Sequence, residues 1–136
     1  MALDPDIFKQ LEDTVARVVR EKWIPLEDDV EETGEVAQDV IDEMKEMGLF
    51  GLTIPEEYGG LGLNTEEEAR LMFEVGKAAP AFRSVFGTTI GIGSQGIVMD
   101  GTDEQKSKYL PKLAAGEIVG SFCLTEPNAG SDAKSL

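Results

Sequence analysis

The chain has 136 residues, of which 41% are hydrophobic and 29% charged, which is the size and composition of one globular domain. It contains no histidine and one cysteine, so the composition excludes Ser-His-Asp and Cys-His catalysis, an internal disulfide and the common zinc sites. Its net charge of −15 argues against binding to nucleic acid or anionic lipid.

The first part of the sequence predicts two helices and a loop. Asp4-Pro5 is typical of a helix start, and apolar residues then recur at helical spacing until Pro25, which should end or kink the helix near Trp23. A second apolar stripe predicts a helix over residues 33–47. Residues 49–64 contain a proline and four glycines and therefore predict an ordered loop.

Two further helices are predicted from capping boxes. The sequences TEEE and TDEQ each fit this pattern, so we expect helices to begin at Thr65 and Thr102. The first should continue to about Ala79, and the second should be interrupted by Pro111.

The end of the chain changes character. Residues 119–125, VGSFCLT, have the composition of a strand, and EPNAGSD follows as a turn-rich loop. A single strand cannot satisfy its own backbone groups, so a sheet beyond Leu136 is expected. We therefore predict an all-α domain over 1–117 and the beginning of a second, truncated domain over 118–136.

The charge and the N-terminus bear on location and surface. No apolar run approaches the roughly 20 residues that cross a membrane, and the N-terminus lacks the pattern of a secretion signal. We therefore expect a cytoplasmic protein without a membrane partner.

Residues 27–46 hold ten acidic side chains and one basic side chain. We interpret them as a solvated helical surface, with an acidic docking surface as the alternative.

Residues 91–96, GIGSQG, match the spacing G-x-G-x-x-G that holds the diphosphate of a dinucleotide. That function needs a crossover helix and a second strand after the glycines, and only IVMD precedes the next turn. We therefore interpret the segment as part of a buried helix whose glycines let neighbouring helices approach. In such a helix Val85, Ile92 and Met99, seven residues apart, would share one face.

A better candidate for a functional site is residues 122–132, FCLTEPNAGSD. A tight turn from Pro127 to Ser131 can aim successive N–H groups outward as a small anion-binding nest. The hydroxyls of Thr125 and Ser131 lie beside it. Many β-turns have a similar composition, so plain turn chemistry is the alternative.

LTEPNAGSD closely resembles the signature of the acyl-CoA dehydrogenases, flavoenzymes that oxidise acyl-CoA thioesters to enoyl-CoA. The phrases GLFGLTIPEEYGGLGL and GTDEQKSKYLPKLAAGE are also similar to that family, in the same order and at similar spacing. The resemblance covers essentially the whole chain. It implies a helical-bundle N-terminal domain that ends in the first strand of a middle β domain. The rest of the β domain and a C-terminal helical domain would lie outside these residues.

The resemblance implies FAD as the cofactor. Its contacts would come from Phe122, Cys123, Leu124, Thr125, Gly130 and Ser131. Thr125 would bond the pyrimidine side of the flavin, and Gly130 and Ser131 would lie near the diphosphate. Ser131 would also contact the acyl-CoA, whereas Phe122 replaces the tyrosine of many members and lacks its hydroxyl. The family's catalytic glutamate belongs to the C-terminal domain, so no catalytic residue and no metal ligand is predicted here.

The resemblance also places residues 82–99 in the long helix that lines the acyl pocket. Arg83-Ser84 is similar to a pair in glutaryl-CoA dehydrogenase, where the arginine meets the free carboxylate of the substrate. Arg83, Ser84 and Thr88 are therefore candidate substrate residues, and a dicarboxylyl-CoA becomes a plausible substrate. A surface arginine or a structural ion pair is the alternative.

The implied reaction is α,β-dehydrogenation of an acyl-CoA, with electron-transferring flavoprotein as the acceptor and a homotetramer as the assembly. The isolated 136 residues are predicted to be inactive. Two alternatives remain, namely an acyl-CoA oxidase-like flavoenzyme and a non-catalytic helical interaction module.

Overall fold

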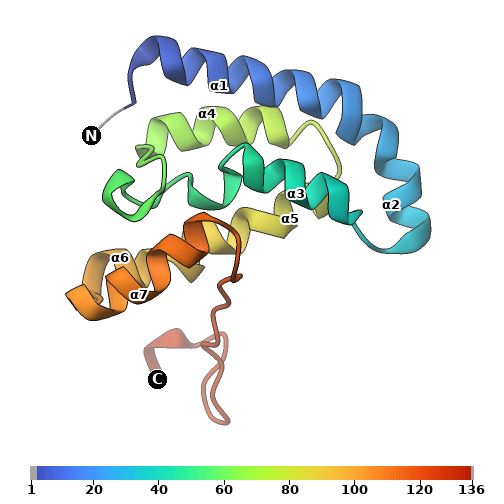
Figure 1. Ribbon diagram of the computed structural model, residues 1–136. Helices are drawn as coiled ribbons and strands as arrows, with labels where there is room; N and C mark the ends of the chain where they lie inside the picture. Colours follow the sequence, from blue (N-terminus) through green and yellow to red (C-terminus); the bar gives the residue numbers. More distant parts are fainter. Residues whose placement is uncertain (1–2, 136) are drawn as a thin grey trace.

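The computed structural model describes residues 3–135, and residues 1–2 and 136, at the outer ends of the two predicted domains, lie outside it. Within the described part the chain is helical and contains no strand, which confirms the all-α class. Figure 1 shows the long first helix lying along α4, with α6 and α7 side by side at the opposite end of the body.

The first helix begins where the sequence predicts. α1 (Pro5–Val18) is capped by Asp4, whose Oδ1 accepts hydrogen bonds from the N–H groups of Asp6, at 2.9 Å, and Ile7, at 3.3 Å. Pro5 occupies the first turn, where its missing N–H costs no hydrogen bond.

Of the two outcomes expected at Pro25, the kink near Trp23 is confirmed and the end of the helix is not. The chain continues through a π-helical turn (Val19–Trp23) and a 3₁₀ turn (Ile24–Leu26) into α2 (Glu27–Thr33). Pro25 lies in the first turn of the 3₁₀ helix, where the N–H that proline lacks costs few backbone hydrogen bonds. The long helix therefore bends here, as Figure 1 shows, instead of stopping.

The predicted helix over 33–47 is shorter than expected. α2 ends at Gly34, which has a left-handed φ of 75°, and α3 (Gln38–Glu46) begins four residues later. The predicted loop that follows is ordered and contains two 3₁₀ turns (Leu49–Gly51 and Glu56–Tyr58). A Cβ at Gly60 would lie 2.0 Å from Ile54 O, so only glycine fits there.

The two predicted capping boxes differ in outcome. α7 (Asp103–Ala114) is capped by Thr102 and Gln105 as predicted, with bonds of 2.8 and 3.3 Å. α4 (Thr65–Val75) is capped one residue earlier than expected, by Asn64 in place of Thr65. The helix also ends at Val75, short of the predicted Ala79.

Pro111 was predicted to interrupt α7, and this prediction is wrong. It lies exposed inside the helix, and its carbonyl accepts a 3.0 Å bond from the N–H of Ala115. Only the bond from its own missing N–H is lost, and the helix continues to Ala114 before Gly116 turns the chain at φ 67°.

The predicted long helix over 82–99 is broken. α5 (Pro80–Thr88) passes through a π-helical turn (Thr89–Gly93) to α6 (Gln95–Asp100), and the backbone of Gly91 lies outside the helical region at φ −98° and ψ −114°. The expected face is also wrong, because Ile92 is 61% exposed and Met99 is 73% exposed. The buried stripe consists of Phe82, Phe86 and Ile90.

The main core lies between α1, α3, α4 and α5. Trp23 stacks on Phe82 with ring centroids 5.4 Å apart and planes at 4°, and Phe50 meets Phe86 edge-on at 6.3 Å. A smaller core beneath α7 consists of Ile54, Leu110, Leu113 and Ala114. No described helix has the length and apolar character that crossing a membrane requires.

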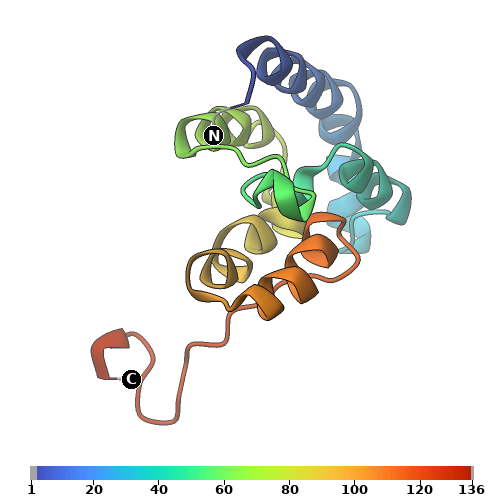
Figure 2. The same ribbon diagram turned by 60° about the vertical axis from the view of Figure 1, so that its left-hand side comes forward.

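The predicted strand over 119–125 is absent. The segment is irregular because no described strand lies beside it to share backbone bonds. The predicted tight turn is confirmed, since Glu126 and Ala129 exchange backbone bonds of 2.8 and 3.2 Å around Pro127 and Asn128. Figure 2 shows this hairpin and a final 3₁₀ turn (Ala133–Ser135) extending away from the helices.

Candidate functional site

The residues predicted to contact FAD lie on the terminal segment, which we define as residues 118–135. All six are exposed to solvent: Phe122, Cys123, Leu124, Thr125, Gly130 and Ser131. The hairpin brings Thr125 and Gly130 together, because a Cβ on Gly130 would lie 3.7 Å from Thr125 Cγ2. Two predicted contacts from opposite sides of the turn are therefore neighbours in space.

The chemistry of this hairpin fits one edge of a flavin nucleotide. Thr125 and Ser131 carry hydroxyls that can donate and accept hydrogen bonds, and Gly130 leaves room for close approach to the backbone. Phe122 and Leu124 are 55% and 39% exposed, so apolar surface lies beside the polar groups. A planar ring with a charged tail needs both kinds of contact.

The substrate candidates lie on α5. The Arg83 side chain runs along the helix over Gly87, where a Cβ would lie 2.7 Å from Arg83 Cζ. Among residues 3–135 Arg83 forms no ion pair, so the described chain offers no partner for a structural pair. Ser84 Oγ donates to Pro80 O over 2.9 Å within the helix, and Thr88 is half-buried one turn later.

The two sets of candidates are not in direct contact. No hydrogen bond or ion pair in the described chain joins Arg83, Ser84 or Thr88 to the hairpin. Ser84 lines an open groove of about 720 Å³ whose other wall is the loop between α2 and α3. The substrate and cofactor roles of all these residues stay predictions.

The glycine-rich segment GIGSQG lies at the kink between α5 and α6, and no strand precedes it. Thr53 Oγ1 donates to Ile90 O on one side of the kink, and Gln95 Nε2 donates to Thr53 Oγ1 over 3.0 Å from the other side. Ser94 Oγ is buried and has no partner among the described residues. The bonds of Thr53 and Gln95 therefore stabilise a bend, so the segment has a structural role.

The structure reveals one contact between this kink and the terminal segment that the sequence does not indicate. The N–H of Gly120 donates to Thr89 Oγ1 over 3.2 Å, and the backbones of Gly93 and Gly120 touch. The only sequence signal is the pair of glycines, which occurs in many loops. Thr53 belongs to the family-like phrase GLFGLTIPEEYGGLGL, but that phrase does not indicate this contact, and Thr89 belongs to no recognisable motif.

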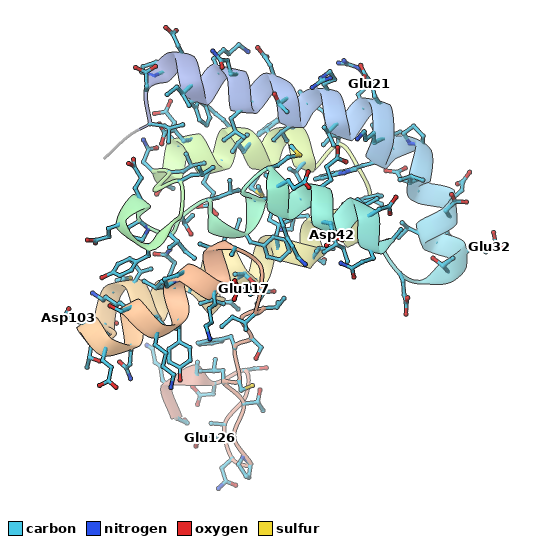
Figure 3. The ribbon with its side chains drawn as sticks, viewed as in Figure 1. Glu21, Glu32, Asp42, Asp103, Glu117 and Glu126 are labelled. Carbon is cyan, nitrogen blue, oxygen red and sulfur yellow. The ribbon has the colours of Figure 1, made fainter. Side chains whose placement is uncertain are left out.

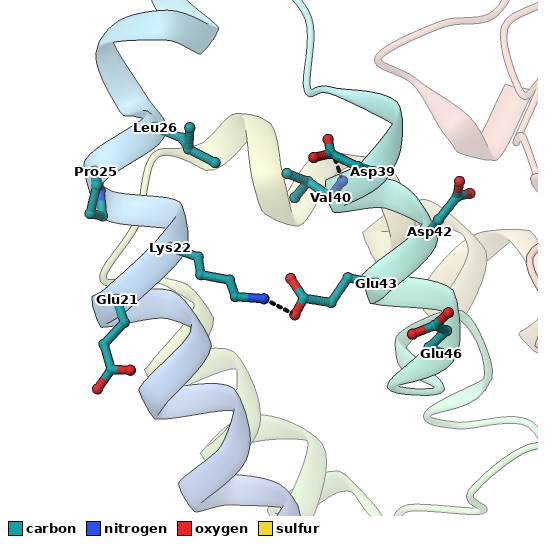
Figure 4. Close-up of a pocket in the computed structure, with 9 residues that line it drawn as sticks. All are labelled: Glu21, Lys22, Pro25, Leu26, Asp39, Val40, Asp42, Glu43 and Glu46. Carbon is teal, nitrogen blue, oxygen red and sulfur yellow. Dashed lines mark hydrogen bonds and ion pairs between the residues drawn. The ribbon is translucent and has the colours of Figure 1, made fainter.

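Many of the acidic residues lie on a different part of the molecule. Figure 3 shows Glu21 and Glu32 on the outer side of the bent α1–α2 unit, far from Glu126 on the hairpin. Between this unit and α3 lies an open groove of about 690 Å³ (Figure 4). Its only cation, Lys22, pairs with Glu43. In residues 3–135 no group of three or more acidic or cysteine side chains is arranged to hold a metal ion.

Comparisons with known proteins identify relatives along the whole chain. A family model described as "Acyl-CoA dehydrogenase, N-terminal domain" matches residues 6–117. The very long-chain specific acyl-CoA dehydrogenase, mitochondrial, of Macaca fascicularis is 43% identical over 131 residues, which are 96% of this chain and 20% of that protein.

Solved structures agree. An acyl-CoA dehydrogenase complexed with FAD from Bacillus anthracis matches with a TM-score of 0.81 and 36% identity, over 98% of this chain and 23% of that one. A glutaryl-coenzyme A dehydrogenase in complex with glutaryl-CoA matches with a TM-score of 0.83 and 29% identity, over 100% of this chain and 35% of that one. The chain thus spans between a fifth and about a third of the length of these relatives.

Proposed function

This chain belongs to the acyl-CoA dehydrogenase family, and from that premise we propose that it is the N-terminal part of an FAD-dependent acyl-CoA dehydrogenase. The reaction would remove hydrogen from the α- and β-carbons of an acyl-CoA thioester and give an enoyl-CoA. The observation that carries the proposal is the exposed hairpin directly after the helical body, where Thr125 and Gly130 come together beside two accessible hydroxyls.

FAD, when bound, supplies the acceptor for the hydride that leaves the β-carbon. The chain's own residues would bind the cofactor and orient the substrate. Thr125 and Ser131 would hydrogen-bond the cofactor, and Gly130 would let a phosphate approach the backbone. Helix α5 would form one wall for the acyl chain and hold it in one orientation. Removal of the α-proton is assigned to no residue of this chain.

The direct test is to purify the complete gene product and measure its flavin content and its reaction with acyl-CoA. We expect bound FAD and acyl-CoA-dependent reduction of electron-transferring flavoprotein. Oxygen consumption in place of that reduction would favour the acyl-CoA oxidase-like alternative. A folded product without flavin would favour the non-catalytic helical module. The isolated 136 residues should show no turnover, because they carry no assigned base.

The substrate class can be tested at Arg83. Its guanidinium is exposed and unpaired within the described chain, which suits a bidentate contact with a free carboxylate. If it makes that contact, Arg83→Ala should lower the ratio of kcat/KM for dicarboxylyl-CoA over monocarboxylyl-CoA roughly 10- to 100-fold, as expected for a hydrogen bond to a charged group. Arg20→Ala is the control, because Arg20 lies exposed on the π-helical turn after α1 and not on α5. An unchanged ratio would leave Arg83 as a surface residue.

Location and assembly stay predictions. We expect the gene product to be cytoplasmic and to form a homotetramer, whereas the macaque relative is described as mitochondrial. Cell fractionation and the mass of the native assembly would test the two expectations separately.

A further inference from the structure

Beyond residue 118 the terminal segment is hydrogen-bonded to the helices at one place in the described chain. The N–H of Gly120 donates to Thr89 Oγ1 over 3.2 Å. Thr89 is completely buried at the start of the π-helical turn, so its hydroxyl has a fixed position. We call the pair Thr89 and Gly93, which both meet Gly120, the Gly120 seat.

The second half of the seat is a contact between two backbones. A Cβ on Gly93 would lie 3.1 Å from Gly120 Cα and 2.8 Å from Thr88 O. A Cβ on Gly120 would lie 2.9 Å from Gly93 Cα. Side chains do not tolerate such distances to backbone atoms, so both positions need glycine.

The seat is braced by a third segment of the chain. Thr53, from the loop before α4, donates its hydroxyl hydrogen to Ile90 O and accepts a 3.0 Å bond from Gln95 Nε2. Ile90 and Gln95 lie on opposite sides of the kink at Gly91. One hydroxyl therefore ties together both arms of the bend and fixes where the seat lies relative to α5.

We propose that the Gly120 seat orients the flavin-contacting hairpin, which makes Thr89 and Gly93 positioning residues for FAD. This inference rests on the proposed function. The first predicted flavin contact, Phe122, follows Gly120 by two residues, so a rotation at Gly120 carries the hairpin with it. The seat also begins directly after Thr88, and thus one braced turn places both the acyl wall and the flavin edge.

The test titrates the apoprotein of the complete gene product with FAD. Thr89→Val removes the hydroxyl at nearly the same volume and leaves the N–H of Gly120 without its partner. We expect the FAD dissociation constant to rise roughly three- to tenfold, the range that one hydrogen bond gives. Thr89→Ser keeps the hydroxyl and should bind FAD as the wild type does.

Gly93→Ala supplies an independent variant, because its methyl group would separate the two backbones and should weaken FAD binding at least as much. Its matched control is Gly96→Ala, whose Cβ would meet no atom within 4 Å and should leave FAD binding unchanged. Hydrogen exchange of the Gly120 amide gives a local readout, and it should quicken in Thr89→Val but not in Thr89→Ser.

The outcomes separate the inference from the proposed function. Equal FAD affinity in the wild type, Thr89→Val and Thr89→Ser would overturn the inference while the flavoenzyme stands. Equal weakening by Gly93→Ala and Gly96→Ala would also overturn it, since the effect would then not depend on the seat. A wild-type product that binds no FAD would overturn the proposed function and the inference together.

Discussion

The helical body and the terminal segment differ in that the body has a hydrophobic core of its own and the segment does not. In the body Trp23, Phe82 and Phe86 are completely buried, where Trp23 stacks on Phe82 and Phe86 meets Phe50 edge-on. In the terminal segment Phe122 and Leu124 are exposed, and beyond residue 118 one bond, from Gly120, joins the described segment to the helices. The body carries its own core, whereas the segment presents apolar and hydroxyl groups for contact. Stability and candidate function are thus separated along the chain.

The largest expected effect tests this separation directly. Trp23→Ala removes a buried ring that stacks on Phe82, and we expect the free energy of unfolding to fall by about 3–5 kcal/mol. Phe122→Ala, in the terminal segment, should change it by less than about 0.5 kcal/mol. Urea unfolding followed by circular dichroism measures both. A similar loss from the two variants would mean that the segment belongs to the core.

A smaller effect is expected at the start of α4, and it tests which residue caps this helix and stabilises the body locally. Asn64 Oδ1 accepts bonds from the N–H groups of Glu66 and Glu67 at 2.9 and 3.0 Å. Asn64→Ala should therefore lower the free energy of unfolding by about 0.5–2 kcal/mol. Thr65→Ala should have almost no effect, because Thr65 is exposed and does not cap the helix. The reverse order in urea unfolding would place the cap at Thr65.

The smallest effect concerns an ion pair between two helices of the body. Arg70 donates from Nε and Nη2 to both oxygens of Glu12, at 3.0 and 2.9 Å, and these bonds hold the pKa of Glu12 below its ordinary value of 4.5. A carboxylate with a lowered pKa stabilises the fold above the unfolded-state pKa, and this contribution is lost as the pH falls through the folded-state pKa.

Arg70→Gln should therefore lower the free energy of unfolding only slightly at pH 7, since Arg70 is half-exposed, and should lower it less as the pH falls below about 4.5. Urea unfolding at pH 7, 5 and 3 measures the difference. Arg20→Gln is the control, because Arg20 pairs with Glu21 on the open surface and should change stability by less than about 0.5 kcal/mol. An equal cost at all three pH values would show that Arg70 acts through packing over Phe8 instead.

The sequence predicts helix positions well where one local rule applies and less well where two compete. The box at Thr102 has no rival and is confirmed. At α4 the patterns Asn64-x-x-Glu67 and Thr65-x-x-Glu68 differ by one residue, and local spacing cannot choose between them. A distant contact favours the first, because Glu67 Oε1 also accepts a 3.1 Å bond from Leu3 N–H.

The effect of a proline or a glycine on a helix depends on its surroundings. Pro111 removes one backbone donor, yet α7 continues through it, whereas the helix bends at Pro25. Gly91 was expected inside a helix, yet it forms a kink that depends on Thr53, a residue 38 positions earlier. Such bends are set by tertiary contacts, which a local pattern does not contain.

The candidate site shows the same division. The hairpin turn follows from Pro127 and Asn128 and was predictable from local chemistry. The Gly120 seat joins residues about 30 positions apart through a hydroxyl and two glycines. Gly93 belongs to GIGSQG, but the spacing of that segment does not indicate Gly120 as a partner. Residues 119–125 have a β-like composition, but the predicted strand does not form, because a strand requires a neighbour that the described residues do not provide.

The acidic surface over α1–α3 has a consequence for how copies of the chain behave together. At neutral pH a net charge of −15 makes the molecules repel one another, which favours colloidal dispersion. Near the isoelectric point, at pH about 4.2, this repulsion disappears while Phe122 and Leu124 remain exposed. Repulsion between the carboxylates of different molecules thus keeps their exposed hairpins apart. Light scattering should therefore rise steeply as a solution is acidified toward that pH.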